Sequence, residues 1–177
     1  GRAGKRSPCW QRRRLRPAAP APAGGEVKLQ YGIEWRLIRA GFPALVFSPP
    51  DDSLHTARLN LLSTGLVSKL FPVDDRYVSN YFGNGCVADV WLQAQEGSRR
   101  RETKITYDRG ARRASYQEKD LVKNQVLTNQ LAVSECTYDV LGALHELRNR
   151  KLEPGQSVQL PISDGKKMVS ARVEAQE

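Results

Sequence analysis

The fold is decided by the stretch Tyr77-Val-Ser-Asn-Tyr-Phe-Gly-Asn-Gly-Cys-Val-Ala-Asp-Val-Trp-Leu92. At its centre lies Asn84-Gly85, the pair preferred by two-residue type I′ turns of β-hairpins. The register that follows pairs Phe82 with Val87, Tyr81 with Ala88, Val78 with Trp91 and Tyr77 with Leu92. Apolar partners then meet on both faces, which predicts a hairpin inside a larger sheet.

Alternating apolar and polar residues predict further strands on both sides of this hairpin. From Val27 to Leu37 the pattern has a period of two, which is typical of a half-buried strand. Residues 120–135 show no such pattern, and we expect a long loop there. The other expected strands are 42–47, 54–62, 102–107 and 112–118, with loops or turns at 49–52, 96–98 and 108–110.

One amphipathic helix is predicted at residues 138–150. Thr137 or Asp139 can cap its start, and Pro154-Gly155 follows its end. The residues that share one face at helical spacing are Val140, Leu141, Leu144 and Leu147.

A shorter helix is expected after Ser63-Thr64, before Pro72. The apolar residues on its one side are Leu66, Val67, Leu70 and Phe71. The chain is expected to end with a hairpin, strands 156–162 and 166–174, around Ser163-Asp164-Gly165.

These elements predict a mainly β fold: a curved antiparallel sheet, open or a half-barrel, with the 138–150 helix packed on it. Residues 1–25 are rich in Arg, Pro and Ala, so we expect a disordered segment. Residues 26–177 are expected to form a single β-rich domain. Most of the net charge of +9 lies in 1–25, which contains no acidic residue, so the charge says little about the partners of the domain.

No pattern of residues indicates an enzyme. Gly83-Asn-Gly-Cys-Val-Ala88 matches the dinucleotide pattern GxGxxA, but that pattern requires a following helix and the next residues read as a strand. The paired carboxylates Asp51-Asp52 and Asp74-Asp75 read as loop residues. We therefore expect no catalytic residue and no cofactor.

The cysteines and histidines are scattered along the chain, so we expect no metal site. Cys86 and Cys136 leave two interpretations open: a disulfide in an oxidising compartment, or two unpaired thiols, which is the simpler interpretation. His145 lies beside the apolar face of the predicted helix, and we interpret it as a surface residue.

Basic residues gather in the predicted hairpin 99–113, where Tyr107 and Tyr116 flank them. They are Arg99, Arg100, Arg101, Lys104, Arg109, Arg112 and Arg113. Such a surface can bind single-stranded nucleic acid, and the alternative is a charged sheet edge that resists aggregation. We favour the charged edge and expect no nucleic-acid partner. Nucleic-acid binding through this hairpin and the basic tail is the alternative function.

A ligand site is predicted between the sheet and the helix, because one short helix leaves part of a twisted sheet open. We expect it to hold a lipid-like or otherwise apolar small molecule. The residues expected to line it are Trp35, Tyr77, Tyr81, Trp91, Leu92, Leu141, Leu144 and Leu147. The alternative is that these side chains pack on one another as an ordinary core.

The order of several motifs is similar to that of a known bacterial family. They are Tyr31-Gly-Ile-Glu-Trp-Arg-Leu-Ile-Arg-Ala-Gly41, Leu66-Val-Ser-Lys-Leu-Phe-Pro-Val73 and Asp139-Val-Leu-Gly-Ala-Leu144. From Tyr31 to its end the chain resembles the exported-protein family catalogued as domain of unknown function 3108.

The resemblance implies a location in the periplasm or cell envelope, with no established activity and no catalytic residues. Relatives usually begin with a signal peptide, which is not visible in 1–25, and continue past Glu177, so we expect a fragment. No apolar run reaches the ~20 residues of a transmembrane helix. The function we expect is that of a non-catalytic envelope protein with a lipid-like or apolar ligand.

Overall fold

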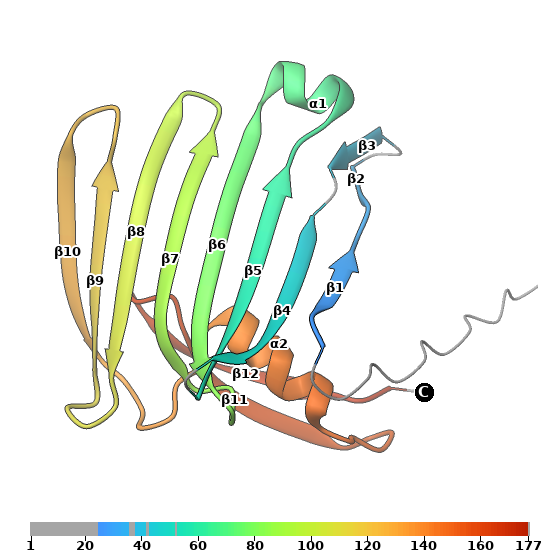
Figure 1. The fold of residues 1–177 in the computed structure, drawn as a ribbon, viewed down its shortest axis with the longest axis vertical. Coiled ribbons are helices and arrows are strands. Elements are labelled where there is room, and N and C mark those ends of the chain that lie inside the picture. Colours follow the sequence, from blue (N-terminus) through green and yellow to red (C-terminus); the bar gives the residue numbers. More distant parts are fainter. Residues whose placement is uncertain (1–24, 36–37, 42, 52, 177) are drawn as a thin grey trace, which may run out of the picture.

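The computed structural model describes residues 25–35, 38–41, 43–51 and 53–176. Within these residues an antiparallel sheet of eight strands dominates the fold, in the order β1-β4-β5-β6-β7-β8-β9-β10 (Figure 1). The sheet curves but does not close, because β1 and β10 are its free edges. The predicted fold class, an open and curved antiparallel sheet with a helix on it, is confirmed. The expected disorder of 1–25 concerns residues that, apart from Gly25, lie outside the described part.

The strands of the main sheet are β1 (Val27–Gln30), β4 (Ala44–Asp51), β5 (Leu54–Leu62), β6 (Val73–Phe82), β7 (Val87–Glu96), β8 (Arg99–Asp108), β9 (Arg113–Asp120) and β10 (Gln125–Ala132). Two small antiparallel pairs accompany it: β2 (Ile33–Trp35) with β3 (Ile38–Gly41), and β11 (Ser157–Ser163) with β12 (Met168–Glu174). The helices are α1 (Gly65–Leu70) and α2 (Val140–Asn149). The consecutive strands from β4 to β10 form a meander, as the short predicted turns require.

The hairpin of β6 and β7 has a longer turn than predicted. The Gly85 amide donates to the Phe82 carbonyl at 2.8 Å, and the Phe82 amide donates to the Cys86 carbonyl at 2.9 Å. The loop therefore contains three residues and ends at Gly85, whose φ of +78° is a conformation that suits glycine.

This longer turn shifts the pairing near the tip of the hairpin by one residue. Tyr81 pairs with Val87 instead of Ala88, and Ala88 is the extra residue of a β-bulge. Beyond the bulge the predicted register holds, since Tyr77 pairs with Leu92. The apolar pattern sets the register along most of the hairpin, whereas the turn sets it at the tip.

The predicted long loop 120–135 is wrong, because β10 lies within it. The Asp120 carboxylate accepts hydrogen bonds from the amides of Val122 and Lys123, both at 2.9 Å, which closes a tight turn from β9 into β10. β10 is an edge strand exposed over nearly its whole length. Because β10 is exposed on both faces, its sequence lacks the alternation of apolar and polar residues from which a strand is predicted.

Two other predicted boundaries differ. The strand expected at 27–37 is divided into β1 and β2. The Tyr31 amide still donates to the Pro43 carbonyl at 3.1 Å, in register with the β1–β4 pairing, and β2 then pairs with β3 instead of β4. The loop expected at 49–52 is mostly strand, since β4 continues through Pro49 and Pro50.

One end of the sheet is covered by α2 and by the β11–β12 hairpin, while α1 stands at the opposite end (Figure 1). We call the covered side of the sheet its inner face. Asp139 begins α2 as predicted, and its carboxylate accepts from the amides of Leu141 at 3.3 Å and Gly142 at 2.9 Å. A Cβ at Gly142 would lie 2.5 Å from the Gly85 carbonyl oxygen, so only glycine lets α2 approach the tip of the β6–β7 hairpin this closely.

A disulfide between Cys86 and Cys136 fastens the same region. The Val87 amide donates to the Thr137 carbonyl at 2.8 Å, which holds the hairpin tip against the segment that enters α2. The cysteines are 50 residues apart in sequence, but this contact brings them together. The interpretation as two unpaired thiols is therefore wrong.

Candidate ligand-binding site

Directly paired residues of an antiparallel sheet place their side chains on the same face, so the register defines rows that cross the inner face. The covered row lies under α2 and β11–β12 and consists of Val27, Phe47, Ala57, Ser79, Val90, Ile105, Tyr116 and Asn129. The marginal row is the next row on the same face, two residues closer to α1 along each strand. It consists of Leu29, Leu45, Leu59, Tyr77, Leu92, Thr103, Glu118 and Leu127.

The two rows differ in burial although both are largely apolar. Most of the covered row is buried, including Phe47 and Ile105, and Gly165 of the β11–β12 turn lies directly over Ile105 and Tyr116. In the marginal row Leu59, Tyr77 and Leu92 stay partly exposed. The inner face thus presents apolar side chains beyond the edge of its cover.

A hollow of about 230 Å³ lies at this edge, above β6 to β9. Its floor is mostly apolar and comes from the sheet: Tyr77, Val90, Leu92, Ala94, Thr103, Ile105 and Tyr116. Its rim is charged, with Arg101 and Glu118 from the sheet and Asp164 and Lys166 from the β11–β12 turn. The arrangement suits an apolar group on the floor and a polar group at the rim.

The rim charges form one network around Glu118. The Tyr116 hydroxyl donates to the Glu118 carboxylate, and Lys166 Nζ lies 3.2 Å from the same carboxylate. Arg101 approaches it to 3.9 Å. The hydrogen bond from Tyr116, followed by the bond from Lys166, lowers the pKa of Glu118, so this carboxylate is ionised at neutral pH.

A buried hydrogen bond ties the marginal row to α2. The Tyr77 hydroxyl donates to Asp139 Oδ2 at 2.9 Å, and Asp139 is only 1% exposed. Burial raises the pKa of Asp139, and burial beside this carboxylate raises the pKa of Tyr77. The sequence predicts Asp139 as a helix cap but does not reveal its bond to Tyr77, because the two residues lie 62 positions apart.

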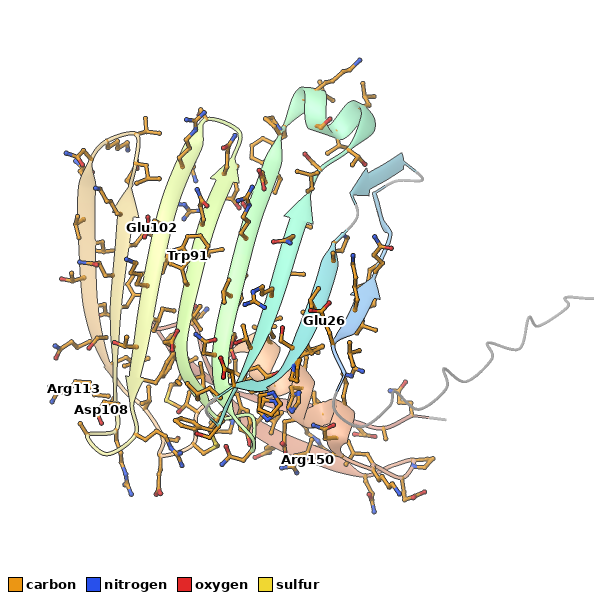
Figure 2. The ribbon with its side chains drawn as sticks, in the orientation of Figure 1. Glu26, Trp91, Glu102, Asp108, Arg113 and Arg150 are labelled. Carbon is orange, nitrogen blue, oxygen red and sulfur yellow. A yellow bond between two sulfur atoms is a disulfide. The ribbon has the colours of Figure 1, made fainter. Side chains whose placement is uncertain are left out.

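The structure divides the predicted site residues of the sheet among three places. Tyr77 and Leu92 line the hollow. Tyr81 is fully buried below α2. Trp91 lies on the outer face, where its Nε1 donates to Glu102 at 3.3 Å. Figure 2 labels both side chains, which come from the neighbouring strands β7 and β8. Trp35 lies in β2, and its side chain is outside the described part.

The predicted apolar face of α2 is likewise divided. Leu141 is buried against the sheet, in one cluster with Tyr81 and Phe47. Leu147 packs toward β11–β12, beside Leu160. Leu144 is 40% exposed and Val140 is 58% exposed, so the prediction that all four share a buried face is wrong. Helix α2 is wedged between the sheet and a hairpin, and it therefore buries two narrow stripes instead of one broad face.

His145 is not the surface residue that the sequence suggested. It is half-buried, and its ring packs against those of Tyr81, His55 and Phe47, with centroid distances of 4.9, 5.1 and 5.9 Å. The pattern of α2 could not show this, because the partners come from β4, β5 and β6.

The basic hairpin 99–113 carries acidic partners for several of its charges. Arg101 pairs with Glu96 at 2.6 Å, and Lys104 pairs with Glu102 at 3.4 Å. These contacts leave fewer basic groups for phosphates than the sequence count suggests. The absence of a nucleic-acid partner stays a prediction.

The described residues contain no group of three or more His, Cys, Asp or Glu side chains that could hold a metal ion. None of their helices is long and apolar enough to cross a membrane.

The fold and the hollow define a class of protein: an open antiparallel sheet whose inner face is covered by a helix at one end only. A family model described as "Protein of unknown function (DUF3108)" matches residues 30–177, and the chain therefore belongs to this family. No curated protein and no solved structure matches the chain.

Proposed function

We propose that this protein is a non-catalytic protein of the cell envelope that binds a lipid-like or apolar ligand at the edge of its covered inner face. The observation that carries the proposal is the hollow over β6 to β9, where Tyr77 and Leu92 stay partly exposed on an apolar floor. Water in contact with such a floor is released when an apolar ligand covers it, and this release favours binding.

The size and the rim of the hollow limit the kinds of ligand that it can bind. Its volume of about 230 Å³ lies below the ~300–1,000 Å³ of pockets that enclose a whole drug-sized molecule. It therefore suits one alkyl chain, with the rest of the ligand outside. Lys166 at the rim has N–H donors beyond its bond to Glu118 and can meet a polar head group.

The disulfide supports the envelope location. Disulfides persist in oxidising compartments such as the bacterial periplasm and are rare in the reducing cytosol. The Cys86–Cys136 bond joins two structural segments and lies in the covered end of the fold. A protein that depends on this bond is suited to an oxidising compartment outside the cytosol, which the family resemblance also implies.

Titration with a fluorescent fatty-acid probe tests the proposal. The emission of the probe should change saturably, with little dependence on salt because the main contact is apolar. Replacing Leu92 by Gln should weaken binding about tenfold, since it places a polar amide on the apolar floor. Trp91 lies on the outer face, so its emission is a poor signal for binding at the hollow.

Leu62→Gln is the matched control. Leu62 is 51% exposed, and its pairing with Asp74 places it on the outer face. This variant should bind the probe as the natural sequence does. Equal weakening in both variants, or no saturable binding at all, would contradict the proposed site.

A further inference from the structure

A second hollow, of about 240 Å³, lies at the other end of α2, between the last turn of this helix and strands β4 and β5. It shares no lining residue with the first hollow. One part of its wall is apolar, formed by Val27, Phe47, Pro49 and Pro50, and the polar part consists of Ser48, His55, His145, Arg148 and Asn149.

Two polar side chains of this hollow, Arg148 and His55, make ring contacts but no hydrogen bond or ion pair within the described part of the chain. The Arg148 guanidinium lies 5.0 Å above the Phe47 ring and forms no ion pair. The imidazole of His55 stacks on the Tyr81 ring at 5.6 Å and makes no hydrogen bond. The hydroxyl of Tyr81, which does not line the hollow, is buried and has no hydrogen-bond partner among the described residues. Because Arg148 is exposed and His55 is partly exposed, both can present their N–H donors to a solute that enters the hollow.

His145 can add a further donor. The amide nitrogen of Asn149 lies 2.9 Å from His145 Nε2, and in the tautomer in which Nε2 accepts this bond the ring proton resides on Nδ1. Burial, together with the neighbouring His55, lowers the pKa of His145 and favours this neutral ring.

The charges around the hollow are one-sided. Among the described residues, none that lines it carries a carboxylate. The acidic neighbour of His145 on α2, Glu146, is engaged by Arg150 at 2.7 Å. A hollow with a guanidinium and imidazole donors, and without an acidic side chain, favours an anion.

We propose that this hollow binds a small molecule in which an oxyanion, carboxylate or phosphate, is attached to a short apolar body. The oxyanion meets Arg148, His55 and His145, and the apolar body lies on Phe47 and the adjoining prolines. The inference rests on the unpartnered groups at this hollow and does not depend on the ligand proposed for the first one.

Nuclear magnetic resonance of the two histidine rings tests this proposal directly, because the chain contains only two histidines and both line the hollow. The protein is titrated separately with hexanoate, hexyl phosphate, inorganic phosphate and 1-hexanol at constant ionic strength. Hexanoate and hexyl phosphate should shift both histidine signals saturably, with a Kd at least tenfold lower than those of inorganic phosphate and 1-hexanol.

Arg148→Gln should weaken the binding of both alkyl oxyanions about tenfold, whereas Arg113→Gln, which changes an exposed arginine of β9, should leave it unchanged. Equal affinity for 1-hexanol would refute recognition of the oxyanion, and equal affinity for inorganic phosphate would refute the apolar half of the site. Unmoved histidine signals, or full binding by Arg148→Gln, would overturn the proposal.

Discussion

The two ends of the inner face are built from the same strands and the same alternating pattern, yet they differ in what covers them. At the α2 end a helix, a hairpin and a disulfide cover the sheet, and most of the covered row is buried. At the α1 end the helix buries none of its own residues, and Leu66, Leu70 and Phe71 are all more than half exposed. The comparison teaches that alternation shows which face of a strand is apolar, but not which part of that face is covered.

Removing the disulfide is the strongest way to disturb the covered end. Replacing both Cys86 and Cys136 by Ala should lower the free energy of unfolding by about 4 kcal/mol, because the bond closes a loop of about 50 residues. Denaturant titration with and without a reducing agent measures the effect. An unchanged midpoint of unfolding would show that the covered end does not depend on this link.

The two faces of α2 give a sharper comparison within one helix. Leu141→Ala should destabilise the protein by about 3 kcal/mol, because Leu141 is buried against the sheet. Leu144→Ala should have an effect of at most about 0.5 kcal/mol, since Leu144 is largely exposed. Thermal and denaturant unfolding of both variants measure the difference. Equal effects would mean that α2 is oriented differently on the sheet.

Asp139 joins the cover to the marginal row, and its removal should have the next largest effect. Asp139→Ala should cost about 2 kcal/mol, because it removes the helix cap and leaves the Tyr77 hydroxyl without its acceptor. Asp139→Asn keeps an oxygen acceptor and should retain most of the stability. If Asn were as damaging as Ala, charge and not hydrogen bonding would be the property that matters at this position.

The fold could be predicted from the sequence wherever a local pattern determined it. The alternating residues of β5 and β7, the capped α2 and the final hairpin all follow from neighbours within a few positions. β10 was missed because an exposed edge strand has no apolar face to reveal it. The tip of the β6–β7 hairpin shifted because a type I′ turn needs positive φ at both of its central residues, and of Asn84 and Gly85 only Gly85 has it.

The candidate site could be predicted only in part, because it depends on contacts between distant segments. Tyr77 and Leu92 were named and do line the first hollow, since the hairpin register places them opposite each other. Trp91 directly precedes Leu92 and therefore lies on the other face, because successive side chains of a strand point to opposite faces of the sheet. The ring cluster around His145 joins four elements, so no local pattern contains it.

The same alternation provides the most direct test of the central claim, that the marginal row holds an apolar ligand. A fatty acid with a diazirine in its alkyl chain would be bound, photolysed and located by mass spectrometry with residue resolution. We predict labels on the inward residues Leu59, Tyr77 and Leu92, competed by unlabelled fatty acid, and none on their outward neighbours Val78 and Trp91. Labels spread over inward and outward residues alike, or not competed, would contradict the account.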